Sequence, residues 1–239
     1  MVLVRRLHNW IIGILCFLFI TILFPLESKT KSIKITDPFD IYPNDIKFNV
    51  LRNNEIIGRH LVTFSRLGID EYRVLVQLNL QVNFLSFPIY KFDYKSDAVW
   101  FNGELKSLNA HQNDDGESLN IKIFKDSNGL VVQNANTEAR TDLDALPTNH
   151  WNVGVLEQNE VINTLTGEIS LVEITSLGKS KIVAQGKSIF ARKYKYTGDI
   201  SALVWYSDGG NWVKLEFEGK DGSVIKYDCV ECGLRESSR

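Results

Sequence analysis

Apolar and polar residues alternate with a period of two along most of this chain from position 46 onward. Between residues 72 and 82 the even positions are all aliphatic or aromatic, whereas the odd positions are mostly charged or amide side chains. A second run, between residues 90 and 100, repeats the pattern. Because alternate side chains of a strand point to opposite faces, each run predicts a strand with one buried and one wet face. Leu85-Ser86-Phe87-Pro88 connects the two runs, which predicts an antiparallel hairpin.

Turn residues separate the other alternating runs. Asn53-Asn54 and Asn102-Gly103 are typical of two-residue hairpin turns, since both central residues of such a turn need a positive φ. No segment of about 20–50 residues repeats, which excludes a propeller or solenoid. The predicted strands are 46–52, 55–66, 72–82, 90–100, 104–111, 117–125, 129–134, 167–177, 181–185, 188–197, 201–207, 211–219 and 223–229.

Consecutive long strands that each carry one apolar face must curl around a shared core, because a flat sheet would leave that face in water. The sequence therefore predicts an all-β fold, a strongly bent antiparallel sheet or incomplete barrel. Its only candidate cover is the interruption at 135–165. There Trp151, Val155 and Ile162 are four and seven residues apart, which predicts a short helix over 149–158 with Thr148 or Asn149 as its N-cap. This loop and helix would form a plug.

The N-terminus has the order of an export signal. Arg5 and Arg6 precede an uncharged apolar run, residues 10–26, which predicts an N-terminal apolar helix and a protein exported to a bacterial periplasm. The run is short for a membrane span, but no small-x-small cleavage site follows it, so a cleaved signal peptide and an uncleaved anchor both stay open. If uncleaved, residues 10–26 contact the membrane. The expected plan is 1–28 signal peptide or signal anchor, 29–45 tether, 46–229 antiparallel β-shell domain and 230–239 C-terminal tail.

Charge and motif content exclude several classes of function. The chain has 27 basic and 29 acidic residues, and the leader up to the end of the apolar run, residues 1–26, holds two of the basic and none of the acidic ones, so the remainder carries a formal charge of 25 − 29 = −4. Such a domain has no basic stripe to neutralise phosphates, and nucleic acid is not expected as a partner. The patterns G-x-S-x-G, H-E-x-x-H, G-x-G-x-x-G and the EF-hand loop are all missing from the sequence. No catalytic residue, metal ligand or cofactor is assigned.

Short motifs are spread over residues 46–228. They are Asn54, Ile57-Gly58-Arg59-His60, Val62, Phe64, Trp100, Gly103, Leu105, Asp114-Asp115-Gly116, 147–152, 163–167, Trp205-Tyr206 and 212–215. As a set they resemble an uncharacterised family of exported proteobacterial proteins, a domain of unknown function. That family is similar in layout to the bent-sheet periplasmic domains of the lipoprotein carriers LolA and LolB. The resemblance implies an envelope location and an open β-shell, and it brings no established reaction.

Cys229 and Cys232 form a C-x-x-C pair after the last predicted strand. Outside the cytoplasmic membrane a disulfide is the expected state of such a pair. An extended strand would hold the two Cα atoms about 10 Å apart, so a bridge requires a turn at Val230-Glu231. Free thiols, a zinc site or redox catalysis are the alternatives, and zinc would need further ligands that no second C-x-x-C supplies.

Three histidines are candidates for a site. His150 lies next to Trp151 and Asn152, where it could act as a general base or bind an anion; alternatively Trp151 anchors the plug and the two polar side chains bond nearby carbonyls. His60 is on the apolar face of its strand and is expected to be a satisfied core residue. His111, beside Asp114 and Asp115, could bind a cation or shuttle protons, but a hairpin needs an Asn- and Asp-rich turn in any case, so His111 is expected to be structural.

Aromatic side chains on the predicted inner faces either fill the shell or line it. A partly open shell lined in this way takes an apolar or amphipathic ligand such as lipid, without catalysis, and this is the function that the sequence favours. An envelope hydrolase that uses His150 with Glu138, Asp142 or Asp144 is one alternative, and a structural envelope protein that works through an exposed strand edge is another. The predicted ligand-binding residues are Tyr90, Phe92, Trp100, His150, Trp151 and Trp205.

Overall fold

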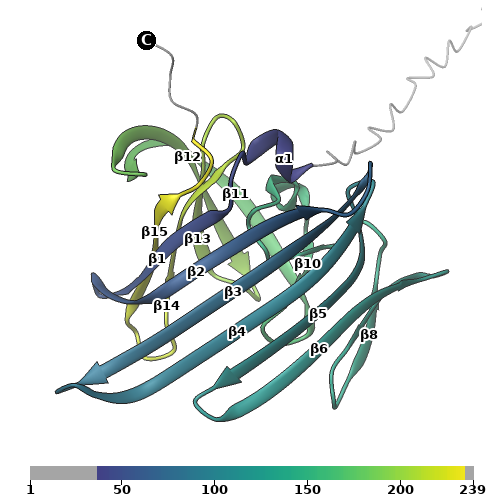
Figure 1. Ribbon diagram of the computed structural model, residues 1–239, viewed down its shortest axis with the longest axis horizontal. Coiled ribbons are helices and arrows are strands. Elements are labelled where there is room, and N and C mark those ends of the chain that lie inside the picture. Colours follow the sequence, from purple (N-terminus) through teal and green to yellow (C-terminus); the bar gives the residue numbers. More distant parts are fainter. Residues whose placement is uncertain (1–36, 235–239) are drawn as a thin grey trace, which may run out of the picture. The chain divides into compact units, whose positions relative to one another are not determined.

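The computed structural model of the protein describes residues 37–234 (Figure 1). The chain divides into two units, 1–32 and 33–239, and every described element belongs to the second. The predicted leader lies outside the described residues, and none of the helices in 37–234 is long and apolar enough to cross a membrane.

The helices are α1 (Pro38–Ile41) and the 3-10 helix η1 (Val153–Glu157). The strands are β1 (Ile46–Arg52), β2 (Glu55–Arg66), β3 (Glu71–Phe84), β4 (Phe87–Phe101), β5 (Glu104–Asp114), β6 (Glu117–Asp126), β7 (Gly129–Gln133), β8 (Glu138–Thr141), β9 (Leu146–Pro147), β10 (Glu160–Asn163), β11 (Glu168–Ala184), β12 (Lys187–Gly198), β13 (Ala202–Tyr206), β14 (Trp212–Glu218) and β15 (Val224–Glu231).

These strands form one strongly bent sheet, which confirms the predicted all-β class. Its 15 strands follow the order β8-β7-β6-β5-β4-β3-β2-β1-β15-β14-β13-β12-β11-β10-β9, so the first and last strands of the chain pair in the middle. Neighbours are antiparallel except β9 and β10. No ladder in 37–234 joins the edge strands β8 and β9, so the sheet is not closed into a barrel. A hydrogen bond from Thr141 Oγ1 to Glu160 Oε1 spans from β8 to β10.

The alternation in the sequence becomes the two faces of the sheet. In β3 the even residues from Tyr72 to Leu78 are buried in the core, whereas Arg73 on the outer face pairs with Asp97 of β4. The hairpin turns also follow the prediction, because Asn53-Asn54 and Asn102-Gly103 all have positive φ. Period two and turn chemistry thus determine the consecutive hairpins.

Residues 148–158, which we call the plug, do not form the predicted α-helix over 149–158. They contain the single 3-10 turn η1. Its N-cap is Asn152, whose side-chain oxygen accepts a hydrogen bond from the backbone N–H of Gly154. Gly154 and the β-branched residues beside it disfavour a longer helix. Ile162 does not continue the helix, because it pairs with Pro147 and Ile169 in a small sheet region of β9, β10 and β11. The predicted strands at 167–177 and 181–185 are one strand, β11, with an irregularity between Ser176 and Lys179.

The second half of the predicted tether belongs to the fold. Asp37 caps α1, and Tyr42 is only 1% exposed. The Tyr42 hydroxyl donates to the backbone oxygen of Trp151 at 2.9 Å and accepts from the backbone N–H of Trp212 at 3.0 Å. Residues 37–45 therefore connect the plug to β14 instead of forming a loose tether.

The C-terminal cysteines are at bonding distance, as predicted. The Cα atoms of Cys229 and Cys232 are 6.0 Å apart and the pair forms a disulfide. The chain after β15 is held by Gln185, whose side-chain oxygen accepts from the backbone N–H groups of Cys232 and Leu234. The expected turn at Val230-Glu231 is not formed: β15 continues to Glu231, and a bulge that leaves Val230 unpaired opposite Lys47 and Phe48 brings the two cysteines together.

Candidate functional site

A cavity of about 230 Å³ lies inside the shell beside the plug. One wall is the inner face of β2, β3 and β4, and the opposite wall is that of β12 to β15. The plug and the turn after β10 cover it. Its lining residues are His60, Val62, Val76, Leu78, Tyr94, Thr148, Asn149, His150, Trp151, Asn163, Thr164, Leu165, Tyr196, Ile200, Ser201, Ala202, Trp212, Leu215, Phe217 and Tyr227.

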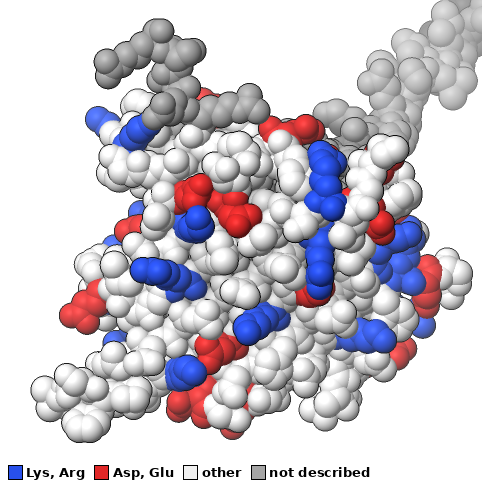
Figure 2. Space-filling view, viewed as in Figure 1, with Lys and Arg blue, Asp and Glu red and all other residues white. Residues whose placement is uncertain are grey.

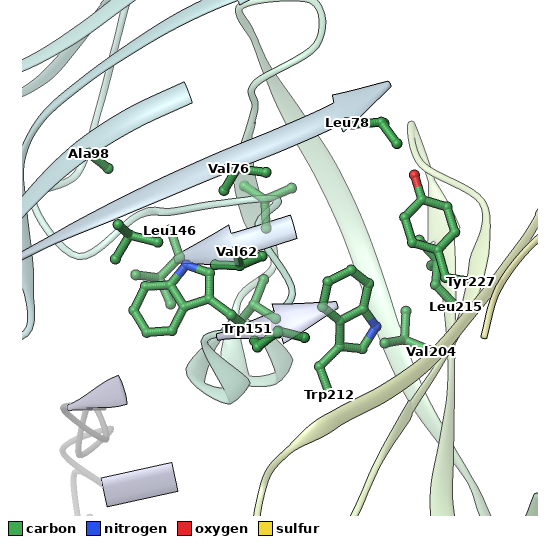
Figure 3. Close-up of a cluster of buried hydrophobic side chains, with 14 of the residues drawn as sticks. Val62, Val76, Leu78, Ala98, Leu146, Trp151, Val204, Trp212, Leu215 and Tyr227 are labelled. Atoms are coloured by element: carbon green, nitrogen blue, oxygen red, sulfur yellow. The ribbon is translucent and has the colours of Figure 1, made fainter. Parts of the chain in front are cut away.

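Trp212 is the common neighbour of the polar rings in this cavity. Its ring centroid is 5.4 Å from that of His60, 5.4 Å from that of His150 and 5.9 Å from that of Tyr227. Figure 3 shows Trp212 near Leu215 and Tyr227, and Trp151 near Leu146 and Val62. The two histidines come from β2 and from the plug, so only the folded shell brings them to one indole ring.

Packing of Trp151 fixes the position of His150. The Trp151 indole is 1% exposed and meets the rings of Trp100, Phe64 and Tyr72 edge-on, with centroids 5.4, 5.6 and 6.3 Å away. The backbone oxygen of His150 accepts a hydrogen bond from the Tyr206 hydroxyl at 2.9 Å. Because the Trp151 side chain and the His150 backbone are both held in place, the His150 ring has a defined position in the cavity wall.

The cavity is electrically neutral near pH 7. Burial lowers the pKa of His150 to about 4; burial and, secondarily, the nearby His150 lower the pKa of His60 to about 3. Burial also raises the pKa of Tyr227 and of Tyr196 above the usual tyrosine value. None of the lining residues is Asp, Glu, Lys or Arg. The cavity wall therefore offers hydrogen bonds and apolar contact, and no charge.

Several polar atoms of the cavity wall lack a hydrogen-bond partner within 37–234. Among them are both ring nitrogens of His60, Nδ1 of His150 and the side-chain nitrogen of Asn149. Buried polar groups normally have partners, and leaving one unpaired costs about 1–3 kcal/mol. A neutral histidine offers one donor and one acceptor, and the amide nitrogen offers donors. These atoms can therefore hold the polar end of a molecule whose remainder contacts the aromatic and aliphatic walls.

The residues predicted to bind a ligand separate into three groups. His150 and Trp151 line the cavity. Phe92 and Trp100 are buried in the core, 8% and 0% exposed, and Tyr90 is half-buried with its hydroxyl hydrogen-bonded to Asp114; none of these three lines the cavity. Trp205 does not face the interior.

The position of Trp205 corrects the expectation of an inward ring. Its Nε1 donates to Ser180 Oγ at 2.9 Å, and the ammonium groups of Lys193 and Lys214 lie 5.0 and 4.8 Å from its ring centre. The ring is thus buried under lysine side chains on the outer face. All five residues of β13 are hydrophobic or aromatic, so the pattern of this strand does not tell the inner from the outer face.

His60 is a candidate site residue that the sequence pattern undervalued. It faces the interior, as its alternation with Val62 predicts, but neither ring nitrogen has the partner expected of a satisfied core histidine. Alternation predicts which face of the strand carries His60, but it does not predict whether the ring nitrogens have hydrogen-bond partners. Tyr196 and Tyr227 join the site for a similar reason, because each lies on the inner face of a strand far along the chain.

The remaining candidates lie elsewhere. His111 bonds to Asn120 at 2.8 Å and borders an open hollow of about 580 Å³ lined by residues of β3 to β7 and the segment after β7. Glu138, Asp142 and Asp144 do not line the cavity that holds His150. No group of three or more His, Cys, Asp or Glu side chains with metal-binding geometry occurs among residues 37–234.

Comparisons with known proteins place this shell in a family. A β-barrel-like protein of the domain of unknown function DUF1849 from Brucella abortus has a similar crystal structure, with a TM-score of 0.59, 10% identity, and coverage of 82% of this chain and 99% of that one. At this identity the likeness concerns the fold alone. No curated protein matches the chain. Residues 48–230, which include the sheet and the cavity, match the domain of unknown function DUF6134, and the protein therefore belongs to the DUF6134 family.

Proposed function

We propose that this protein binds a neutral amphipathic small molecule or lipid in the cavity beside the plug and does not transform it. The observation that carries the proposal is the set of unpartnered polar atoms of His60, His150 and Asn149 in a wall that is otherwise aromatic and aliphatic. Such a wall satisfies the polar end of a ligand by hydrogen bonds and covers its apolar part. The β-barrel-like neighbour supports a shell that can enclose a ligand.

The size of the cavity limits what it holds. Ligand pockets commonly measure about 300–1,000 Å³, so a space of about 230 Å³ suits a small molecule or one end of a longer one. Each Å² of apolar surface that the ligand buries contributes about 25 cal/mol, so a few hundred Å² yields several kcal/mol before the cost of ordering. This is enough for micromolar binding without a charged group.

The proposal includes an envelope location. The apolar run 10–26 after two arginines supports export, either as a cleaved signal or as an anchor that touches the inner membrane. The bonded pair Cys229 and Cys232 supports an oxidising compartment, where such bridges persist. The resemblance of the sequence motifs to a family similar in layout to LolA and LolB also favours an envelope location.

Both alternative functions account for less of what the site shows. A hydrolase needs a carboxylate near His150, and none of the residues that line the cavity is Asp or Glu. A structural role could use the edges of β8 and β9, which no ladder in 37–234 covers, but it would not explain the unpartnered polar atoms of the cavity wall. Ligand binding is therefore the function to test first.

The test is mass spectrometry, under native conditions and after solvent extraction, of full-length protein purified from the envelope of the cells that make it. We expect a bound organic molecule. Ala202→Phe places a ring in the cavity and should abolish retention, whereas Leu203→Phe, one residue along on the opposite face of β13, should leave it intact. Equal retention by both variants, or no bound molecule in the native protein, would contradict the proposal.

A further inference from the structure

The hairpin of β3 and β4 extends beyond both of its neighbours. Leu80 is the last β3 residue that pairs with β2, and Phe92 is the last β4 residue, toward the turn, that pairs with β5. Residues 81–90 thus form a free two-stranded ribbon, which we name the apolar finger. Figure 1 shows it projecting from the sheet at the lower left. It contains no Lys, Arg, Asp or Glu, and the matching projection in Figure 2 is white.

The tip of the apolar finger exposes large hydrophobic side chains on both faces. Phe84 is 64% exposed, Leu85 78%, Phe87 73% and Ile89 59%. Patches of this kind on soluble domains mark an interaction site. A groove on a protein partner would cover one face of the ribbon and leave the other in water, whereas the acyl region of a bilayer surrounds an inserted tip on all sides.

The residues in the turn at the tip are not the ones that would make this turn most stable. Leu85 and Ser86 have φ of 46° and 73°, the left-handed region that Asn and Gly occupy in the turns at Asn53-Asn54 and Asn102-Gly103. Leucine is a poor choice for this conformation, since its Cβ crowds the backbone there. The chain therefore places an apolar side chain at the outermost position although a polar Asn-Gly turn would be more stable.

The inner face of the apolar finger is continuous with the candidate site. Leu78 lines the cavity, and the same face of β3 continues through Leu80 and Val82, both half-buried, to the exposed Phe84. Six residues of strand span about 20 Å. An uninterrupted apolar row thus leads from the cavity wall to the tip.

We propose that the apolar finger inserts its tip, residues 84–89, into the acyl region of a lipid bilayer surface. The occupant is the bilayer because the tip is apolar on every side, carries no charge and continues an apolar row into the shell. The significance of that row rests on the proposed ligand site, but insertion does not require the cavity to be occupied. Penetration is shallow, because the free strand edges of the ribbon carry backbone groups that need water or headgroups.

Photo-crosslinking from the full-length chain tests the proposal. A benzophenone amino acid replaces Phe87 in protein reconstituted with vesicles of equal parts phosphatidylethanolamine and phosphatidylglycerol, and lipid adducts are measured by mass spectrometry. Matched probes replace Phe190 of β12 and Ile69 of the β2–β3 turn, which are 64% and 91% exposed. The readout is local to the probe, so membrane contact by residues 10–26 does not enter it. We expect about tenfold more lipid adduct from position 87 than from either control.

A polar tip provides the second measurement. With the probe at Ile89, the changes Leu85→Asn and Ser86→Gly, together with Phe84→Thr and Phe87→Thr, should reduce adducts to the level of the controls. Asn-Gly favours this turn, so the thermal unfolding midpoint should not fall, and lost labelling cannot be assigned to misfolding. Phe190→Thr should leave the labelling from Ile89 unchanged.

The possible outcomes separate this proposal from the ligand proposal. Equal adducts at positions 87, 190 and 69, adducts to another protein chain in place of lipid, or full labelling with the polar tip would each overturn insertion. Ala202→Phe, which fills the cavity, should leave the adducts at position 87 unchanged. Ligand retention without adducts would refute only the apolar finger, and adducts without retention would refute only the cavity.

Discussion

His60 and His150 show how burial decides the behaviour of single residues in this shell. Each ring contacts Trp212, and each has a pKa well below that of a free histidine because the charged form would lose its hydration. Both are therefore neutral at pH 7, where they offer hydrogen bonds to a ligand. The same loss of hydration makes the stability of the folded state depend on pH.

We expect the folded state to lose stability as the pH falls from about 6.5 toward 4, because the unfolded chain takes up protons on both histidines there and the folded chain does not. Above about pH 6.5 the contribution of these two histidines to folding stability is fully present. Urea unfolding at several pH values measures the slope, which should approach about 1.4 kcal/mol per pH unit for each histidine. His150→Gln should reduce the slope. An unchanged slope in His150→Gln would contradict the assignment.

The plug is the element that organises the interior. It has one turn of 3-10 helix and no long hydrogen-bonded segment, so its position depends on the Trp151 side chain and on two tyrosine hydroxyls that bond to its backbone. One of these is Tyr42, from the segment before β1. The plug, the N-terminal segment and β14 are therefore one packing unit, held by a few directional contacts.

Trp151→Ala should cost about 3–5 kcal/mol of unfolding free energy, because it leaves a hole against Trp100, Phe64 and Tyr72 that the bent sheet cannot close. Trp205→Ala removes an equal ring from the outer face and should cost less, since lysine stems and solvent can fill the space. Chemical denaturation of both variants makes the comparison. A loss below about 1 kcal/mol in Trp151→Ala would show that this ring is not an anchor.

At the largest scale, residues 37–234 form a meander whose first and last strands meet in the middle of the sheet. β1 and β15 pair there, whereas β8 and β9 end the sheet near each other without a ladder between them. Central strands are covered on both edges by hydrogen bonds, and edge strands are not. Local stability should therefore fall from the central pair, β1 and β15, toward the edge strands β8 and β9. We call the open junction between these two edge strands the seam.

Hydrogen exchange should report this gradient. Paired amides of β1 and β15 should exchange about a hundredfold more slowly than those of β8 and of the apolar finger, because opening the centre requires separating both halves of the sheet. Mass spectrometry of peptides after timed labelling measures it. Exchange at β8 as slow as at β1 would show that the seam is closed by a ladder in solution.

Alternation and turn residues determined, without further information, the all-β class, the run of hairpins from β1 to β7 and the inward face of residues such as Tyr72 and Phe92, because these depend on neighbours in sequence. Only the tertiary structure decided the pairing of β1 with β15, the single turn of the plug, the outward ring of Trp205 and the meeting of His60 and His150 at Trp212. Those features join residues that are far apart in the chain or lie on strands apolar on both faces. Local periodicity carries no information about such contacts, and the bending of the sheet creates them.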